Sequence, residues 1–266
     1  MHHYLSTAIK AVRQASSIII RDSIDKNQIK IKKKEDGTFS TNTDVNAERC
    51  IVSMIHNIYP EHDIYSEECG WAYKRNSNSV WYIDPIDGTN NFIHGIPHYA
   101  ISIGLIERGI VTHGVVYDPN LNEMFTASRG VGAFLNDRRI RVSTCSNISQ
   151  AHVNICTQKP QKDGDNLTVI QALNSRINSF RVMGSSSLAL SYVATGRFDA
   201  FFGEKLKTFD IAAGSLLVTE AGGIVSELFP QKNITYLESG DVLASSPKLV
   251  TMFIKIMKEN INSLDS

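Results

Sequence analysis

The first third of the chain carries apolar residues at helical spacing. Leu5 and Val12 belong to one apolar face of a segment over residues 4–21, which predicts an amphipathic helix. The same spacing predicts a second helix over residues 44–58. Between these helices, residues 29–40 are typical of a hairpin that turns at an Asp-Gly pair. The sequence therefore predicts that the chain begins with two helices joined by a β-hairpin.

Beyond residue 100 the pattern changes to short apolar runs separated by turn residues. We expect strands over residues 101–106, 110–117, 123–127, 133–135 and 140–142. After residue 143 strands and helices alternate, with strands expected at 153–156, 180–183, 199–202 and near 224 and 242, and helices at 167–175, 186–195, 210–220 and from 247. The pattern predicts an antiparallel, helix-packed half over residues 1–143 and an alternating α/β half over residues 144–266.

Composition narrows the classes of partner. The chain has 266 residues, of which 42% are hydrophobic, so it can bury a large core. Lys plus Arg and Asp plus Glu both number 27, so no net charge favours nucleic acid or an anionic membrane. The apolar runs are shorter than the roughly 20 residues of a membrane span, and no secretory leader is recognisable. Four cysteines without C-x-x-C spacing indicate free thiols in a reducing cytoplasm.

Residues 84–92 read Asp-Pro-Ile-Asp-Gly-Thr-Asn-Asn-Phe and follow an apolar run. Pro85 cannot donate to a sheet ladder, which predicts that the strand ends at Asp84. Gly88 permits a tight turn, and a short helix is expected from Thr89, with its first amides facing an anion. Asp84 and Asp87 are then placed to bind Mg²⁺ beside a phosphate. The ordinary alternative is a type I turn, which also favours Asp followed by Pro.

Acidic residues elsewhere strengthen the functional interpretation. Glu67 and Glu68 end another short apolar run, Asp44 follows two hydroxyl residues, and Asp210 is placed as the N-cap of a helix. Singly, each is explained by capping or by a solvated strand end. Their joint occurrence favours a cation site.

With these motifs in order along nearly the whole chain, the sequence resembles the inositol monophosphatase family of Mg²⁺-dependent, lithium-sensitive phosphatases. The motifs that carry the resemblance are the apolar run with DPIDGTNNF, the Glu67-Glu68 pair and the FDIAAG segment at Asp210. The resemblance implies an α/β fold of layered α+β type, an α-β-α-β-α sandwich. It also implies two or three Mg²⁺ ions per site and a homodimer.

The resemblance also implies roles for individual residues. The metal ligands would be Glu67, Asp84, Ile86 through its carbonyl, Asp87 and Asp210. Asp44, Glu67 and Thr89 would be catalytic, with Asp44 and Thr89 orienting the attacking water. The substrate would contact Asp87, Gly88, Thr89, Gly184, Ser185, Ser186, Glu204 and Asp210. Lys33 sits where the family often has an active-site lysine on a hairpin, although other lysines surround it.

Two departures from the family pattern concern the substrate. Gly203 stands where inositol phosphatases carry a Glu that contacts ring hydroxyls, and Glu204 follows one residue later; Phe209 replaces the usual Trp. A bulge at Gly203 would return Glu204 to the pocket, and we expect one because glycine permits it. Gly184-Ser185-Ser186 is not a nucleophile elbow, because Leu188 stands where the second Gly is required.

The sequence leaves three functions open. The leading one is hydrolysis of inositol monophosphate to inositol and phosphate by metal-activated water. A bisphosphatase acting on fructose 1,6-bisphosphate or a nucleotide bisphosphate is the alternative within the same superfamily. An alternative of another class is a regulatory protein that binds the transcription machinery. The full acidic set favours an enzyme of small phosphate monoesters, because a binding protein has no physical need for it.

Overall fold

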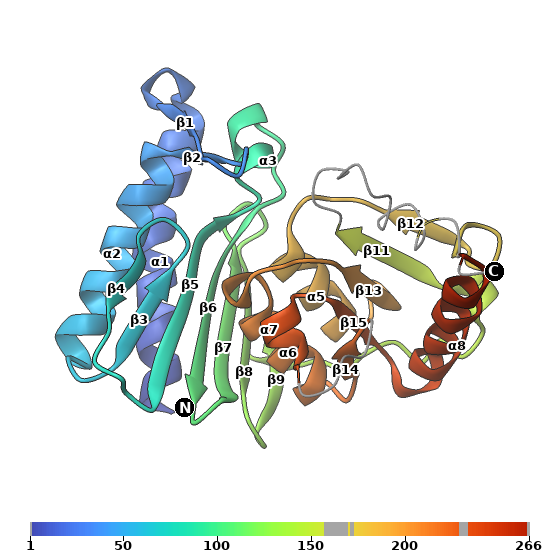
Figure 1. Cartoon of the computed structure of the whole chain (residues 1–266). Coiled ribbons are helices and arrows are strands. Elements are labelled where there is room, and N and C mark those ends of the chain that lie inside the picture. Colours follow the sequence, from blue (N-terminus) through green and yellow to red (C-terminus); the bar gives the residue numbers. More distant parts are fainter. Residues whose placement is uncertain (1, 157–169, 171–172, 229–233, 265–266) are drawn as a thin grey trace.

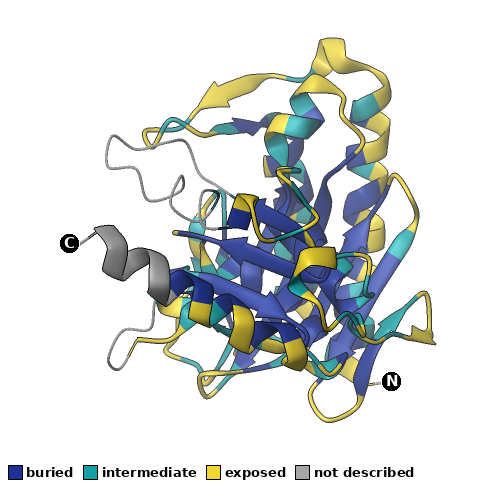
Figure 2. Ribbon diagram, turned by 90° about the vertical axis from the view of Figure 1, so that its right-hand side faces the viewer, coloured by how far each residue is buried: buried dark blue, intermediate teal, exposed yellow. Residues whose placement is uncertain are grey.

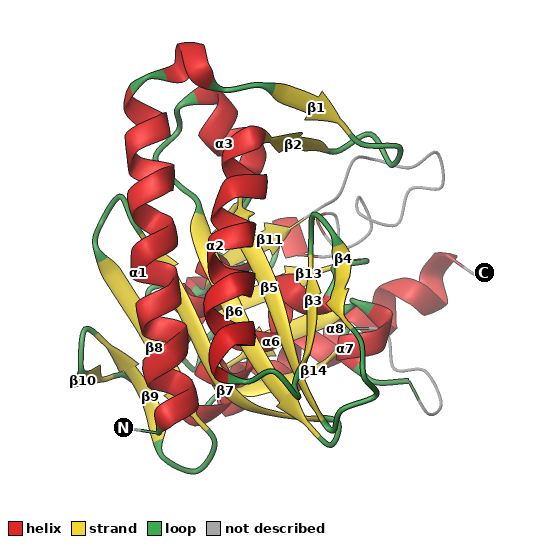
Figure 3. Cartoon of the chain, turned by 90° about the vertical axis from the view of Figure 1, so that its left-hand side faces the viewer, coloured by secondary structure: helices red, strands yellow, loops and turns green. Residues whose placement is uncertain are grey.

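The computed structural model describes residues 2–156, 170, 173–228 and 234–264, and these form five alternating layers of helices and sheets (Figure 1). Two long antiparallel helices, α1 (His3–Ile24) and α2 (Asn42–Ile58), form the first layer. They cover one face of the larger sheet, as Figure 3 shows. Central helices, a second sheet and a last helix follow, which is the α-β-α-β-α sandwich that the sequence predicts.

The larger sheet has eight strands and supplies most of the first half of the chain. Its strands are β3 (Asp63–Ser66), β4 (Gly70–Tyr73), β5 (Ser79–Asp87), β6 (Ala100–Glu107), β7 (Ile110–Asp118), β8 (Glu123–Ser128), β9 (Gly132–Leu135) and β10 (Arg138–Arg139). They lie in the order β10-β9-β8-β7-β6-β5-β3-β4. Only β3 and β5 run parallel, so their carboxyl ends meet at one edge.

The second sheet mixes parallel and antiparallel neighbours in the order β12-β11-β13-β15-β14. These strands are β11 (His152–Cys156), β12 (Ser179–Arg181), β13 (Ala200–Gly203), β14 (Ile224–Glu227) and β15 (Val242–Ser245). The helix α8 (Pro247–Leu264) covers its outer face through Leu249 and Phe253, which pack with Phe202 and Leu243. Its inner face meets the central helices.

The central layer consists of α5 (Ser186–Ala194) and α6 (Thr208–Glu220). Both helices are apolar on nearly all sides, because a sheet lies on each side of them. Two facing glycines in the larger sheet, Gly104 and Gly114, let α6 approach closely. A Cβ at Gly104 would lie 2.8 Å from the Cβ of Ala212, and one at Gly114 would lie 3.0 Å from the Cα of Ala213. This close packing fixes the position of α6, and therefore of its first turn, against the larger sheet.

The smaller elements gather near one end of the larger sheet. They are the hairpin β1 (Ile31–Lys33) and β2 (Phe39–Thr41), the helix α3 (Thr89–His94) and a 3-10 turn at Lys26–Gln28. The short helix α7 (Tyr236–Ser239) and a 3-10 turn at Ile148–Gln150 lie elsewhere in the fold. The central strands of the larger sheet are largely buried, whereas the hairpin strand β1 is exposed and its partner β2 is partly buried (Figure 2). The hairpin arm lies beside α3 in Figure 1.

Several element boundaries differ from the sequence prediction. No strand covers residues 140–142, because the N–H of Val142 donates to the carbonyl of Ala221 instead of a neighbouring strand. The helix α2 begins at Asn42, two residues earlier than predicted, because Thr41 caps it. The helix predicted over residues 167–175 lies mostly outside the described residues.

The structure also bears on the expected lack of membrane spans and on the expected free cysteines. None of the described helices combines the length and apolar composition that a membrane span requires. Cys50, Cys69, Cys145 and Cys156 are all free, as expected.

Candidate metal centre

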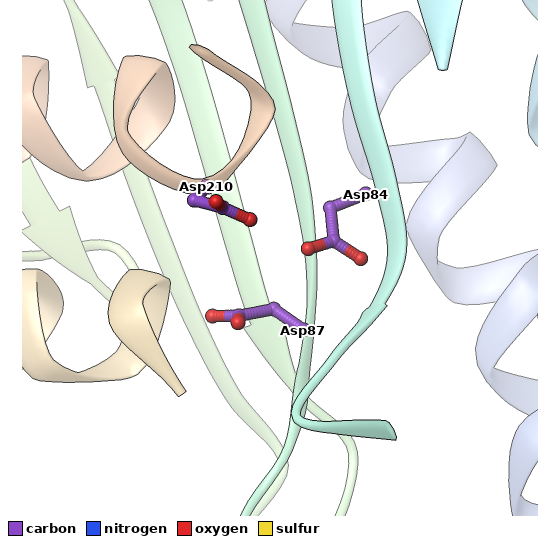
Figure 4. Close-up of side chains that lie close together, drawn as sticks. All are labelled: Asp84, Asp87 and Asp210. Carbon is purple, nitrogen blue, oxygen red and sulfur yellow. The ribbon is translucent and has the colours of Figure 1, made fainter. Parts of the chain in front are cut away.

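Three carboxylates from distant parts of the chain converge between the halves. Asp84 and Asp87 come from the end of β5, and Asp210 comes from the first turn of α6 (Figure 4). One oxygen of each carboxylate lies within 4.8 Å of the others. Figure 4 shows that the three carboxylates point toward one another, so like charges face each other. Such a group can hold a metal ion.

The strand β5 does not stop at Asp84, as the sequence analysis predicted, but continues past Pro85 to Asp87. Asp84 pairs with Ser102 and Asp87 with Ala100, so the register shifts between them. A proline is tolerated at such a bulge because no ladder hydrogen bond is needed there. The bulge points both carboxylates toward α6, and Asp84 Oδ1 accepts a 3.0 Å bond from the N–H of Ile86.

The capping contact at the start of α6 differs from the predicted one and fixes the side chain of Asp210. It is not the N-cap but the third residue of α6, and its Oδ2 accepts a 2.7 Å bond from the N–H of Lys207, the residue at the cap. The helix begins at Thr208 because this reciprocal contact satisfies an amide at its start. The carboxylate of Asp210 faces those of Asp84 and Asp87 (Figure 4).

Asp87 is fixed from the second half of the chain. Its Oδ2 accepts bonds from Ser185 Oγ at 2.7 Å, from the N–H of Ser187 at 2.6 Å and from Ser187 Oγ. Ser185 is the N-cap of α5. The start of α5 therefore orients one oxygen of Asp87 and leaves the other free for a ligand.

Asp44 and Thr89 form a hydrogen-bonded pair beside this cluster. Thr89 Oγ1 lies 3.0 Å from Asp44 Oδ1 and also 3.0 Å from the carbonyl of Ile86. Asp44 Oδ2 accepts a 2.9 Å bond from the N–H of Thr41, which caps α2. The helix α3 begins at Thr89, as predicted, after Gly88 at φ 107°. The pair joins the first turn of α2 to the turn that carries Asp87.

Glu67 follows β3 and lies at the same sheet edge as Asp84. Its N–H donates to the carbonyl of Ile83 in the parallel strand β5 at 3.1 Å. Lys34 Nζ lies 2.8 Å from Glu67 Oε1 and 2.8 Å from Glu68 Oε1. The hairpin lysine that reaches the site is thus Lys34, whereas Lys33 is exposed on β1.

Burial raises the pKa of five carboxyl groups in the site, those of Asp44, Glu67, Asp84, Asp87 and Asp210. The pKa of Asp44 rises to about 7 through burial and then through the charges of Glu68 and Glu67, despite the bond from Thr41. Burial, followed by Glu67, Asp87 and Asp210, holds the pKa of Asp84 well above its usual range.

Asp210, Asp87 and Glu67 follow the same rule. Burial and then Asp87 raise the pKa of Asp210, and burial raises that of Asp87 against the serine donors. Burial raises the pKa of Glu67, which Lys34 opposes. Although burial lowers the pKa of Lys34, the carboxylate of Glu67 outweighs it and the pKa is raised. The raised pKa values of these carboxyl groups indicate that the buried negative charge of the cluster is not fully compensated by nearby cations.

The comparisons with known proteins agree with this geometry. The inositol monophosphatase family matches residues 1–262. The chain belongs to this family. The relatives include the "Putative Nus factor SuhB" of Neisseria meningitidis, 40% identical over 265 residues, with 98% of this chain and 100% of the relative covered. The "Nus factor SuhB" of Vibrio cholerae is 39% identical over 265 residues, which cover 99% of this chain and 98% of the relative.

Solved structures of similar proteins share the whole fold. The extragenic suppressor protein suhB of Bartonella henselae matches with a TM-score of 0.92 and 30% identity, covering 97% of this chain and 99% of that one. The IMPase of Thermotoga maritima matches with a TM-score of 0.87 and 30% identity, covering 98% and 99%. The layered fold predicted from the sequence is confirmed.

The metal dependence of the inositol monophosphatase family fits the donors of this chain. Hard cations prefer carboxylate oxygens, and the centre offers several of these at one place. A buried group of like charges is costly unless a cation compensates it. The raised pKa of Asp84 records that repulsion. Glu67 stands just outside the group of three, but its charge still raises the pKa of Asp84.

The remaining residues that the family resemblance assigns to substrate binding lie around the start of α5 and after β13. Gly184 and Ser185 precede α5, and Ser186 Oγ donates to Cys156 Sγ at 3.1 Å. The bulge expected at Gly203 is absent, because β13 pairs with β15 in regular register through Gly203 and Val242. Glu204 follows in a bend and is buried. Its contact with a substrate stays a prediction.

Sequence reasoning missed three side chains that shape this candidate metal centre. Ser187 was not singled out, although it gives Asp87 two of its three donors. Lys34 was not distinguished from its neighbours, since one residue of register decides which lysine faces inward. The Thr41-x-x-Asp44 spacing is that of a capping box and could have revealed how Asp44 is held.

In metal-free buffer, the thermal stability of the protein should fall as pH rises from 5 to 8. The folded carboxyls hold protons at higher pH than the unfolded ones, so the folded state binds more protons between about pH 4 and 7. The free energy of unfolding therefore falls across this window. From Asp44 alone, we expect Tm to drop by on the order of 5–10 °C.

Scanning calorimetry in EDTA at several pH values measures this drop. The Asp44→Asn variant serves as the control, because it has no titrating group at that position and should show a smaller drop. A Tm that stays level or rises toward pH 8 contradicts the interpretation.

Proposed function

We propose that the chain is a Mg²⁺-dependent phosphomonoesterase that hydrolyses inositol monophosphate to inositol and phosphate. The observation that carries the proposal is the convergence of Asp84, Asp87 and Asp210 within 4.8 Å of one another. The hydrogen-bonded pair of Asp44 and Thr89 supports it, because hydrolysis needs an oriented water as well as a cation. Family membership supports the reaction class.

The carboxylates would hold the metal ions. Glu67, Asp84, Asp87 and Asp210 supply side-chain oxygens and Ile86 its carbonyl, for two or three Mg²⁺ ions. When bound, Mg²⁺ neutralises charge on the phosphate, makes water more acidic and stabilises the leaving oxygen. Lys34 neutralises part of the charge of Glu67 and Glu68.

Asp44 and Thr89 would orient the attacking water. When the Thr89 hydroxyl donates to Asp44 Oδ1, its lone pairs are left to accept a hydrogen bond from water. Asp44 can then take a proton that passes through Thr89 Oγ1. Glu67 would be the third catalytic group, and its charge also acts on Asp44. The remaining protein contacts would position the substrate, through Gly88, Gly184, Ser185, Ser186 and Glu204.

A panel of phosphate esters tests the proposal. Phosphate release would be measured with inositol monophosphate, fructose 1,6-bisphosphate, adenosine 3′,5′-bisphosphate and glycerol phosphate, each with Mg²⁺ and with EDTA. We expect the highest kcat/KM for inositol monophosphate and no release in EDTA. A preference for either bisphosphate would move the assignment to the rival within the superfamily. Release that is equal in EDTA would overturn the metal-dependent mechanism.

Lithium at millimolar concentration should inhibit phosphate release. This expectation rests on family membership and on the physical similarity of a small monovalent ion to a weakly held Mg²⁺. Sodium should not inhibit, because it is larger and fits a Mg²⁺ position poorly. Rates in lithium chloride and sodium chloride would be compared at equal ionic strength. Equal rates in the two salts would count against this part of the proposal.

A second candidate is a regulatory role with the transcription machinery, supported by relatives named "Nus factor SuhB" at 38–40% identity over the whole chain. The two roles separate experimentally. Asp87→Asn should abolish phosphate release and leave any association with purified RNA polymerase unchanged. The homodimer and the cytoplasmic location implied by the resemblance stay predictions, and sedimentation analysis tests the former.

A further inference from the structure

The side chain of Asn91 joins the two halves of the chain beside the metal centre. Its Nδ2 lies 2.7 Å from the carbonyl oxygen of His98 and 2.8 Å from that of Met183. His98 ends the loop that follows α3, whereas Met183 lies just before α5. One amide group therefore bonds to segments that are 92 residues and 7 residues away in sequence.

Both partners of this amide are carbonyl oxygens, which can only accept. The Asn91 NH₂ group has two hydrogens, so it satisfies both acceptors at once, whereas the amide oxygen at the same position would satisfy neither. The orientation of the Asn91 side chain is therefore fixed by chemistry. A substitution that keeps the shape but removes the NH₂ group would leave two carbonyls without this donor.

Glycines keep this junction narrow. A Cβ at Gly88 would lie 3.0 Å from the carbonyl oxygen of His98 and 3.2 Å from that of Gly184. A Cβ at Gly184 would lie 3.2 Å from the Nδ2 of Asn91. Both glycines also have positive φ, at 107° and 79°. The turn that carries Asp87 and the segment before α5 are thus in backbone contact. The hydrogen bonds of the Asn91 amide connect the same two segments.

The segment that Asn91 holds is the one that orients Asp87. Met183 is followed by Gly184 and then by Ser185, which donates to Asp87 Oδ2 at 2.7 Å. Ser187 adds its N–H at 2.6 Å and its hydroxyl to the same oxygen. All three donors to Asp87 thus lie within four residues of the carbonyl that accepts from Asn91.

We propose that Asn91 is a positioning residue for the metal centre: its amide fixes the start of α5 against the Asp87 turn, so that Ser185 and Ser187 hold the Asp87 carboxylate in its ligating orientation. Asn91 acts through these serines, because its amide bonds to the carbonyls of His98 and Met183. The inference rests on the proposed function in one respect, namely that Asp87 binds Mg²⁺.

Calorimetric titration of the metal-free protein with Mg²⁺ tests the proposal without any substrate. Removal of a group that orients a metal ligand typically weakens affinity about 10-fold to 100-fold, so Asn91→Ala should raise the Kd for Mg²⁺ about tenfold or more. The matched control is Asn90→Ala, which removes the same side chain from the exposed neighbouring position. That control should bind Mg²⁺ like the unmodified protein.

A double-mutant cycle with Ser187→Ala separates positioning from general loss of structure. If Asn91 acts through the start of α5, part of its effect is already lost in Ser187→Ala, so the two changes together should weaken Mg²⁺ binding by less than the product of the single effects. Additive effects in the cycle would overturn the proposal. Far-UV circular dichroism and Tm in EDTA would be recorded for each variant.

The remaining outcomes are also decisive. Unchanged Mg²⁺ affinity in Asn91→Ala, with normal binding by the unmodified protein, overturns the inference and leaves the proposed function intact. Absence of Mg²⁺ binding by the unmodified protein overturns both. If Asn91→Ala loses its cooperative unfolding transition, Asn91→Ser, which removes the NH₂ group but keeps a neutral polar side chain, repeats the test. Loss of the fold in both variants would show that Asn91 serves the fold as a whole, and the positioning role would be overturned.

Discussion

Asp84→Asn and Asp87→Asn should each lower Mg²⁺-dependent phosphate release by at least about 100-fold, since even groups that only orient metal ligands are worth about 10-fold to 100-fold. An amide has the shape of the carboxylate but lacks its charge, so it binds a divalent cation weakly. The fold should survive, because both residues repel other carboxylates. Phosphate release from inositol monophosphate and Mg²⁺ titration of the same samples measure the two effects.

Asp84→Asn should also raise Tm in EDTA. Burial and then the charges of Glu67, Asp87 and Asp210 raise the pKa of Asp84, so a neutral amide at this position removes both the cost of a buried charge and the repulsion in the metal-free protein. Mg²⁺ should then stabilise the unmodified protein and leave the variant nearly unchanged. Asp137→Asn, in the exposed turn between β9 and β10, is the control and should alter neither activity nor Tm. Near-normal turnover by both site variants would exclude Asp84 and Asp87 as metal ligands.

Thr89→Ala should lower kcat by about 100-fold or more, the range expected when a positioned proton-transfer group is removed. The hydroxyl that contacts Asp44 is lost, but the carboxylates of the centre remain. The Kd for Mg²⁺ should therefore change little, which distinguishes this variant from the ligand variants. Steady-state kinetics and Mg²⁺ titration would be compared on one preparation.

The matched control for this prediction is Thr89→Ser. Serine keeps the hydroxyl and loses only a methyl group, so kcat should stay within about tenfold of the unmodified value. A Thr89→Ala protein that turns over at a near-normal rate would remove Thr89 from the mechanism. A large loss of Mg²⁺ affinity in Thr89→Ala would instead assign it a role in holding the turn at Asp87.

Single helices, turns and helix starts could be predicted from the sequence, because a few neighbouring residues encode each of them. The apolar spacing of residues 4–21 predicts α1, and Gly88 followed by Thr89 predicts the turn and the start of α3. Where longer-range pairing competes, the same reasoning fails. Pro85 looked like a strand end, but the sheet accommodates it in a bulge, since β6 continues to pair beyond it.

The boundary errors have the same origin. Residues 140–142 have the composition of a strand, but Ile140 makes the last hydrogen bond to β9, and Val142 bonds to Ala221 instead. Gly203 permits a bulge without requiring one, and β15 pairs with β13 in regular register. Asp210 was placed as a cap on its residue type, whereas the backbone of Lys207 occupies that position. A single sequence cannot rank such alternatives, because the deciding partner lies elsewhere in the chain.

The sequence by itself determined the acidic set of this protein, the order of its main elements and its likeness to the inositol monophosphatase family. These depend on residue types and short spacings. The tertiary structure decided which side chains meet. Hairpin register selects Lys34, the paired glycines Gly104 and Gly114 bring α6 and Asp210 to β5, and Asn91 ties the start of α5 to the Asp87 turn. Contacts between residues about 100 positions apart depend on how whole layers pack, which no local pattern specifies.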